Sequence, residues 1–150
     1  MNPLWEKYIS DGKDADAAIA VCIDDTGRFL IVRRSNIDER SGQWTIPGGH
    51  VDPDDKSLEA AASRELEEEA GLVALLEDLQ YLGESRPGKH YFLAKNWSGD
   101  VNVSIPNPST GQIEHDDFKW ATIEEIKDID NSEIPIYLLE KALDMSKNDE

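Results

Sequence analysis

The feature that most constrains this chain is a helix-forming segment, residues 57–70, in which four of five consecutive positions are Glu. At about 100° per residue, Glu65 and Glu69 fall within the stripe formed by the apolar residues Leu58, Ala61, Ala62 and Leu66. Glu68 falls at the edge of this stripe and Glu67 on the opposite side. Carboxylates that point with the apolar residues are costly unless they are paired or bound to a metal ion. The segment therefore predicts a packed helix with a carboxylate face made of Glu65, Glu68 and Glu69, and a surface charge run fits only Glu67.

Composition narrows the class of protein. A chain of 150 residues, 39% hydrophobic and 31% charged, indicates one globular domain covering residues 1–150. Its formal net charge of −17, from 32 acidic and 15 basic side chains, disfavours a general nucleic-acid binder and a protein that docks on anionic membranes. A small anionic substrate stays compatible with this charge if metal ions neutralise the site locally.

The chain lacks the usual sequence marks of membrane insertion or secretion. No apolar run approaches the roughly 18 residues that a membrane helix needs. Residues 1–16 contain no basic region followed by an apolar stretch, so we expect no secretory signal and a cytoplasmic location. Cys22 is the only cysteine, which excludes an internal disulfide, and its apolar surroundings predict a buried small hydrophobe.

The apolar pattern before the acidic helix predicts strands. Residues 17–23 read as a buried strand, residues 24–27 as a turn, and residues 29–34 as the return strand of a hairpin. A short extended piece at residues 44–46 is stopped by Pro47 and two glycines. For the helix, Ser57 or Asp55 is the expected cap at the start and Gly71 suits the position after the end.

After the helix, strands and helices continue to alternate. The expected elements are a strand within 72–82, a strand at 89–95, a loop at 96–111, a short strand at 118–123, a brief helix opened by Thr122 with Glu125 in a capping box, a last helix at 134–145 and a frayed tail at 147–150. Pro135 is expected in the first turn of that last helix. The mixture predicts an α/β or α+β fold with a mixed sheet.

The carboxylate face has the spacing of a cation site. Side chains at i, i+3 and i+4 share one side of a helix, and three carboxylates so close repel one another unless a divalent cation lies among them. All-oxygen ligands suit Mg²⁺ or Mn²⁺. Zinc is disfavoured because no Cys or His pair has ligand spacing, and His50, His90 and His115 are scattered along the chain.

Arg64 precedes this face by one residue and lies four residues before Glu68. It can pair with Glu68 and orient it. The alternative is an ordinary surface ion pair, which contributes less than about 1 kcal/mol. The two glycines at 48 and 49 offer carbonyl oxygens and a tight turn beside the same site, although a plain turn would also explain them.

These residues resemble the signature of the Nudix family, Gly-x5-Glu-x7-Arg-Glu-U-x-Glu-Glu-x-Gly-U, where U is aliphatic. The second half of the signature matches at Arg64, Glu65, Leu66, Glu68, Glu69, Gly71 and Leu72. Residues 44–51, Trp-Thr-Ile-Pro-Gly-Gly-His-Val, are similar to the usual lead-in. The resemblance implies an α/β/α sandwich with a mixed central sheet across nearly the whole chain.

One position departs from the signature. Six residues after Gly49 the family has Glu, and this chain has Asp55, whereas counting back eight from Arg64 reaches Lys56. The loop is therefore one residue longer than usual, and Asp55 takes the place of a residue that in the family supports the loop and the Arg.

The resemblance also implies an activity. It is the Mg²⁺-dependent hydrolysis, with Mn²⁺ as the alternative ion, of the pyrophosphate in a nucleoside diphosphate linked to another moiety. Carried over by position, the metal ligands are the Gly48 carbonyl, Glu65, Glu68 and Glu69, and the expected catalytic residues are Glu68, Glu69, Arg64 and Glu114. Glu114 lies in a segment similar to the loop that often supplies the general base, and a solvated loop residue is the equal alternative.

Substrate contacts are less constrained. Arg33 and Arg34 end a strand that leads toward the signature, so one of them is a candidate phosphate contact, and Trp44 is a candidate base-stacking residue or a core residue. Pro87 lies near where ADP-ribose-type members carry a Pro, and a turn explains it equally well. Oxidised nucleoside triphosphates, ADP-ribose, dinucleoside polyphosphates and nucleotide sugars all remain open as substrates, and a homodimer is compatible with the resemblance.

Three rival functions remain at this point. A catalytically idle Nudix-fold module that binds a nucleotide or a partner rests on the altered loop at Asp55. An acidic ion-buffering protein predicts that Glu67 matters as much as Glu69 for metal binding. An isomerase on the same fold needs a catalytic Cys, and Cys22 lies well before the signature.

Overall fold

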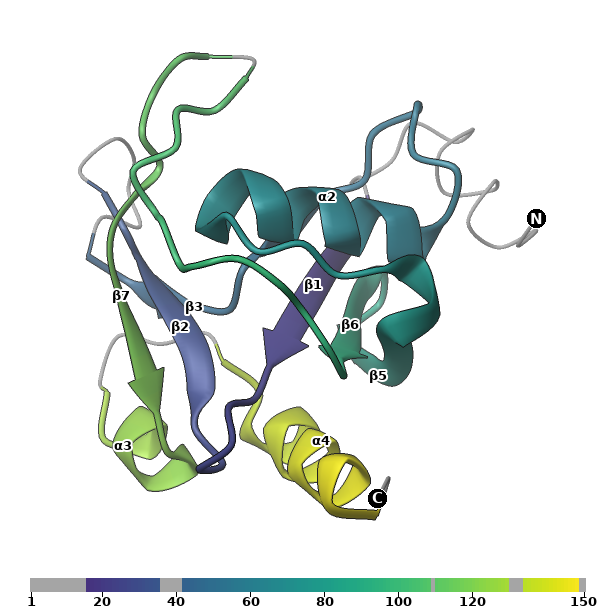
Figure 1. The fold of residues 1–150 in the computed structure, drawn as a ribbon, viewed down its shortest axis with the longest axis vertical. Coiled ribbons are helices and arrows are strands. Elements are labelled where there is room, and N and C mark those ends of the chain that lie inside the picture. Colours follow the sequence, from purple (N-terminus) through teal and green to yellow (C-terminus); the bar gives the residue numbers. More distant parts are fainter. Residues whose placement is uncertain (1–15, 36–41, 109, 130–133, 149–150) are drawn as a thin grey trace.

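The computed structural model describes residues 16–35, 42–108, 110–129 and 134–148 (Figure 1). A four-stranded sheet in the order β4-β1-β6-β5 forms the centre of the molecule. Its strands are β1 (Ala17–Cys22), β4 (Gly48–His50), β5 (Leu79–Arg86) and β6 (Lys89–Ala94). β1 pairs parallel with β6 and antiparallel with β4, so the predicted mixed sheet is confirmed.

A second, antiparallel sheet has the order β3-β2-β7. It contains β2 (Phe29–Arg34), β3 (Trp44–Thr45) and β7 (His115–Ala121), and β7 starts three residues earlier than the predicted strand at 118–123. The predicted hairpin of 17–23 with 29–34 is wrong, because β1 and β2 belong to different sheets and these two segments pair only at the isolated bridge between Ile23 and Phe29. Both strands are apolar along most of their length. β1 pairs with β4 and β6, whereas β2 pairs with β3 and β7.

Helix α2 (Leu58–Ala70) covers one face of the four-stranded sheet. Ser57 accepts a hydrogen bond from the Ala60 N–H and caps the start, and Gly71, at φ 74°, ends the helix, as predicted. Alternate residues of β1 pack under this helix against its apolar stripe in one core that includes Ala18, Ala20, Cys22, Ala61, Ala62 and Leu66. Cys22 is fully buried, as its sequence context predicted.

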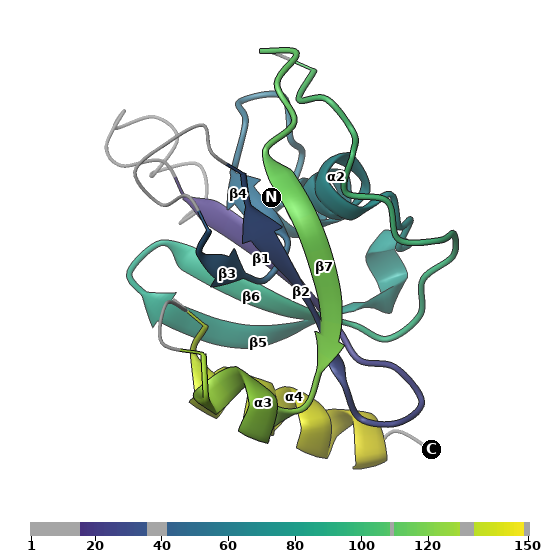
Figure 2. The ribbon, with the colours of Figure 1, turned by 90° about the vertical axis from the view of Figure 1, so that its left-hand side faces the viewer.

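Helices α3 (Ile123–Lys127) and α4 (Ile136–Asn148) lie on the side of the strands away from α2 (Figure 2). The predicted capping box at Thr122 and Glu125 is confirmed. The last helix was predicted two residues too early: Pro135 precedes α4, and its carbonyl accepts from Leu138 and Leu139. The tail predicted from 147 is wrong for 147 and 148, which continue α4, and residues 149–150 lie outside the described part.

The long connection after β6 returns across the α2 side of the molecule to β7. Its described residues 96–108 and 110–111 form no helix or strand beyond isolated bridges, as the loop prediction expected. A short 3-10 helix, η1 (Leu76–Asp78), leads from α2 into β5. None of the described helices is both long enough and apolar enough to cross a membrane.

Candidate active site

The acidic side chains of α2 lie as the helical pattern predicted. Glu65 and Glu69 turn toward the β4 edge of the sheet, Glu68 lies at the rim, and Glu67 is exposed. The side chain of Glu65 is 12% exposed and that of Glu68 is 28% exposed. The α2 stripe therefore carries two carboxylates into a partly enclosed space, where charge is costly unless it is compensated.

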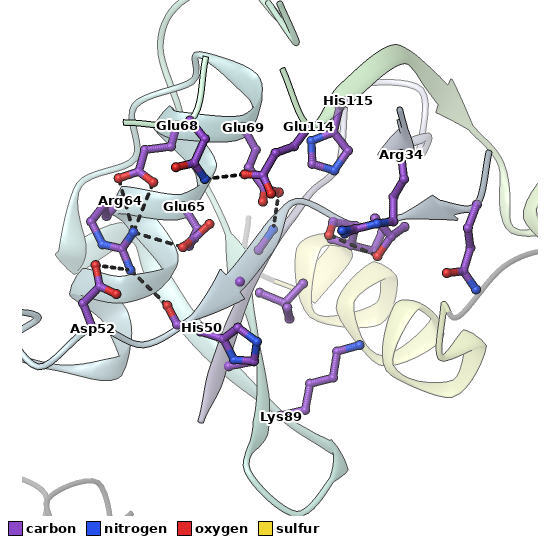
Figure 3. A pocket seen from close by; sticks show the side chains of 18 of the residues that line it. Arg34, His50, Asp52, Arg64, Glu65, Glu68, Glu69, Lys89, Glu114 and His115 are labelled. Atoms are coloured by element: carbon purple, nitrogen blue, oxygen red, sulfur yellow. Dashed lines mark hydrogen bonds and ion pairs between the residues drawn. The ribbon is translucent and has the colours of Figure 1, made fainter. Parts of the chain in front are cut away.

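The Arg64 guanidinium contacts several residues around this carboxylate face (Figure 3). Its Nη1 donates to Glu65 at 3.0 Å and to both oxygens of Glu68 at 3.2 Å. Its Nη2 donates to the His50 carbonyl at 3.1 Å. Only 25% of the Arg64 side chain is exposed, and it makes several charge-assisted hydrogen bonds. Its pairing with Glu68 therefore differs from an ordinary surface ion pair.

Asp55 anchors the other side of the guanidinium. Its two oxygens accept from Nε and Nη2 of Arg64, each at 2.9 Å, and one of them also accepts from the Asp52 N–H at 2.8 Å. Burial alone would raise the pKa of Asp55, but the donors of Arg64 and Asp52 outweigh it and hold that pKa below its ordinary value. The longer loop thus brings a shorter carboxylate into contact with Arg64.

The two glycines shape the bottom of the site. The Gly48 N–H donates to Glu69 at 2.9 Å, which ties the helix carboxylate to β4. A Cβ placed on Gly49 would lie 2.7 Å from an oxygen of Glu65. Gly49 therefore leaves the room that the Glu65 carboxylate occupies, a close approach that a side chain would prevent.

Burial and neighbouring negative charge shift the pKa values of the carboxyl groups on this face. Burial raises the pKa of Glu69 well above its ordinary value, and the nearby Glu65 and Glu114 raise it further, against the Gly48 N–H and Arg34. Burial also raises the pKa of Glu65 to about 7, with Arg64 opposing and Glu68 and Glu114 adding. Like charges in a desolvated space favour a proton or a cation among them.

The oxygen atoms of Glu65, Glu68, Glu69 and the Gly48 carbonyl are ligands that fit a hard divalent cation. Mg²⁺ and Mn²⁺ prefer oxygen ligands, and Gly49 lets the Glu65 carboxylate lie close against β4. Within the described ranges, no three acidic, His or Cys side chains already converge as a metal cluster. Arg64 Nη1 engages one oxygen of Glu65 and both oxygens of Glu68, so a bound ion would share the Glu68 carboxylate with Arg64.

Glu114 lies just before β7 and lines the same cavity, next to Glu69 in Figure 3. It accepts a hydrogen bond from the side-chain amide of Asn107, and its carbonyl accepts from the Ser35 N–H. Its charge reaches both Glu65 and Glu69. This placement favours the predicted site role over a solvated loop residue, although its chemistry as base or ligand stays a prediction.

A cavity of about 450 Å³ lies in front of the carboxylates. Besides the acidic residues and Arg64, it is lined by Arg34, Arg86, Lys89, Asn107, Pro108 and His115 among others. Sequence reasoning missed Arg86, Lys89 and Asn107. No motif marks them, because strand pairing and a long loop, rather than local spacing, bring them to the cavity.

The predicted substrate residues separate into two groups. Arg34 lines the cavity and acts electrostatically on Glu69. Arg33 and Trp44 are not among the lining residues: Arg33 donates to Asp116 at 2.8 Å and lies 5.9 Å from the centre of the Trp44 ring, and Trp44 packs against the core. Pro87 occupies the turn between β5 and β6. These contacts favour structural roles for Arg33, Trp44 and Pro87.

Comparison with known proteins agrees with the site. A family model described as NUDIX domain matches residues 13–141. Nudix hydrolase 15, mitochondrial, of Arabidopsis thaliana is 33% identical over 110 residues, which cover 68% of this chain and 39% of that protein. The asymmetrical bis(5'-nucleosyl)-tetraphosphatase of Rattus norvegicus is 34% identical over 109 residues, covering 67% of each chain.

A solved structure shares the architecture. The crystal structure of a C. elegans Ap4A hydrolase binary complex superposes with a TM-score of 0.59 at 27% identity, covering 88% of this chain and 98% of that one. The similarity therefore extends over the two sheets and the surrounding helices, beyond the signature itself.

Proposed function

Because the chain belongs to the NUDIX domain family, we propose that it is a pyrophosphohydrolase that cleaves a nucleoside diphosphate linked to another moiety. The observation that carries the proposal is the pair of largely buried, mutually repelling carboxylates, Glu65 and Glu69, that line a cavity of about 450 Å³. Such a pair, with Arg64 locked beside it, suits phosphate chemistry that depends on a divalent cation.

In this proposal the Gly48 carbonyl, Glu65, Glu68 and Glu69 would hold Mg²⁺, with Mn²⁺ as the alternative. The bound ion would offset charge on the phosphate oxygens and lower the pKa of a water molecule. The chain's own residues prepare that chemistry. Gly48 fixes Glu69 through its N–H, and Arg64 orients Glu68 with both of its oxygens engaged.

The reaction adds water across one P–O–P linkage. The water oxygen bonds to one phosphorus, the bridging oxygen leaves with the other phosphate, and the water proton passes to a carboxylate. Glu114 is the candidate acceptor, because it lines the cavity opposite α2 and Asn107 holds its side chain. Arg34 is the candidate contact for a substrate phosphate.

The idle-module alternative rested on the altered loop at Asp55. The contact of Asp55 with Arg64 supports the hydrolase instead, because the shorter carboxylate still holds the guanidinium that holds Glu68. The rat relative's name makes dinucleoside polyphosphates the first substrates to try. A cytoplasmic location and a homodimer stay predictions, and light scattering in solution tests the second.

The test is a panel of nucleotide substrates with Mg²⁺, with products identified by mass and the reaction run in ¹⁸O-labelled water. We expect release of a nucleotide monophosphate or phosphate, and label on one product identifies the attacked phosphorus. Glu69→Gln should lower kcat by about 100-fold or more. The matched control is the exposed Glu67→Gln, which should retain activity. Wild-type turnover no greater than that of Glu69→Gln on every substrate would refute the proposal.

A further inference from the structure

An isolated antiparallel bridge between Pro106 and Ile113 closes a short loop that leads into β7 (Figure 1). Inside this bridge the Asn107 N–H donates to the Gln112 carbonyl at 2.7 Å, and the Gly111 N–H donates to the Asn107 carbonyl at 2.8 Å. Gly111 has a φ of 72°, the left-handed conformation that lets the chain turn back. Asn107 therefore anchors the loop through both of its main-chain groups.

The side chain of Asn107 uses its two polar ends differently. Its Oδ1 accepts from the Thr110 N–H at 3.2 Å, and its Nδ2 donates to Oε1 of Glu114. Because a backbone N–H can only donate, Thr110 fixes Oδ1 toward the loop and leaves Nδ2 to face the carboxylate. An amide offers an acceptor and a donor on separate atoms, which a carboxylate of the same size does not. These two partners therefore require Asn rather than Asp at position 107.

The main chain of Glu114 is held by the residue that follows β2. The Ser35 N–H donates to the Glu114 carbonyl at 2.8 Å, and Ser35 Oγ donates to the Ile113 carbonyl at 2.7 Å. Asn107 and Glu114 are both half-buried, whereas the other described residues between them are exposed. The hydrogen bond between these two side chains is therefore the most shielded part of the loop, and it places a carboxylate whose main chain is already fixed.

The hydrogen bond from Asn107 opposes a repulsion that acts on Glu114. Glu114 lines the same cavity as Glu65 and Glu69, and its charge raises the pKa values of both. Like charges would turn an unrestrained Glu side chain toward solvent, and a charge-assisted hydrogen bond from Nδ2 holds it in the cavity. Within the described part of the chain, the second oxygen of Glu114, Oε2, accepts no hydrogen bond, so it is available to take a proton.

We propose that Asn107 is a positioning residue for Glu114: its amide holds one carboxylate oxygen so that the other receives the proton of the attacking water. This inference rests on the proposed hydrolase function. The water oxygen bonds to phosphorus and its proton passes to Oε2, while Asn107 gains and loses no proton. Asn107 also lines the cavity, so a direct contact with the substrate and a purely structural role in the loop are the two rival roles.

The kinetic test measures kcat and KM of Asn107→Ser and Asn107→Asp with Mg²⁺ and the substrate that the nucleotide panel identifies. Both new side chains can still accept from the Thr110 N–H, but Ser is too short to reach Glu114 and Asp has no donor for it. We expect kcat to fall about tenfold or more in each variant, with KM changed by less than about twofold. A rise in KM with kcat unchanged would overturn the proposal in favour of direct substrate contact.

A double-mutant cycle shows whether the loss passes through Glu114. Glu114→Gln should lower kcat about 100-fold or more. The double variant Asn107→Ser/Glu114→Gln should lose no more than about twofold beyond Glu114→Gln alone, because both changes act on one carboxylate. Multiplicative losses would overturn the positioning role, since Asn107 would then act independently of Glu114.

The matched control is Asn102→Asp. Asn102 lies in the same connection between β6 and β7, is exposed, and accepts from the Ser104 N–H through its Oδ1 at 3.0 Å. The same change from amide to carboxylate there has no Glu114 to disturb, and kcat should change by less than about twofold. A loss equal to that of Asn107→Asp would overturn the proposal, because added negative charge in the connection would then explain both variants.

Nuclear magnetic resonance of the side-chain amides gives an answer that does not depend on turnover. In wild type, one amide proton of Asn107 should resonate downfield of those of the exposed Asn102, because it is bonded to a carboxylate, and this difference should disappear in Glu114→Ala. An Asn107 signal that does not depend on residue 114 would overturn the inference even in an active enzyme. An inactive wild type with the Glu114-dependent signal would instead refute the proposed hydrolase, and the pairing of the two side chains would stand.

Discussion

At the residue scale, Arg64 decides how the site is held together. The signature located Arg64 and its helical neighbours correctly, but it left the effect of the longer loop open. The geometry resolves that point. The side chain of Asp55 is 7% exposed and makes a two-oxygen contact with the guanidinium, so Asp and one extra residue replace the longer Glu at this position.

Replacing Asp55 tests this contact. Asp55→Ala leaves a largely buried guanidinium without its main partner, and we expect a loss of about 3 kcal/mol in the free energy of unfolding. For a chain of this size, that corresponds to a fall of roughly 6–12 °C in Tm by calorimetry. The neighbouring Asp54 is exposed, and Asp54→Ala should change stability by no more than about 0.5 kcal/mol. Equal Tm values for the two variants would show that the contact contributes nothing.

At the element scale, the boundaries of α2 followed from local chemistry. Ser57, Gly71 and the apolar stripe act within one segment, so the sequence alone located the helix and its carboxylate face. The pairing partners of the strands were harder to predict from the sequence. Apolar runs at 17–23 and 29–34 indicate buried strands without saying which neighbour each one takes, and the predicted hairpin failed for that reason.

The same limit explains the residues that were missed. Arg86 and Lys89 reach the cavity because β6 lies parallel to β1, a pairing between segments about 70 positions apart. No local pattern encodes that register. Asn107 lies only seven residues before Glu114, in an irregular segment for which hydrophobic periodicity has no signal.

Gly49 of β4 lies against the Glu65 side chain of α2, and replacing Gly49 tests that contact. In Gly49→Ala the added Cβ meets the end of the Glu65 side chain, which can move, so Tm should change little while the carboxylate is displaced. We expect kcat to fall by about tenfold or more. The double variant Gly49→Ala/Glu65→Gln should lose little more than Glu65→Gln alone, because both changes act on one carboxylate. Additive losses would place the effect of Gly49 elsewhere.

At the scale of the whole molecule, two sheets between helices bring an acidic helix and basic strand ends to one cavity. On the carboxylate side of that cavity, burial and neighbouring like charges disfavour the ionised forms of Glu65 and Glu69. The folded-state pKa of Glu65 is raised from 4.5 to about 7 and that of Glu69 is raised as well. A raised folded-state pKa contributes stability that is complete below the unfolded value and is lost as pH rises through the folded value.

The metal-free protein should therefore lose stability between about pH 4.5 and 7, by at most about 1.4 kcal/mol per pH unit for each carboxyl. The Glu69→Gln variant has no ionisable group at position 69. The difference between its Tm and that of wild type should therefore rise from about pH 4.5 to pH 7. Added Mg²⁺ should remove most of that difference near pH 7. Melting curves from pH 5 to 7.5, with EDTA or Mg²⁺, measure both effects. A difference in Tm that is independent of pH would show that Glu69 is not titrating as described.

The central claim is that Glu65, Glu68 and Glu69 form a divalent-cation site, and Mn²⁺ binding measured by isothermal titration calorimetry tests it most directly. Wild type should bind Mn²⁺, Glu69→Gln should weaken binding about tenfold or more, and Glu67→Gln, on the solvent side of the same helix, should bind as wild type does. Equal weakening by Glu67→Gln and Glu69→Gln would contradict the account, because it would mean that the helix attracts cations by charge alone.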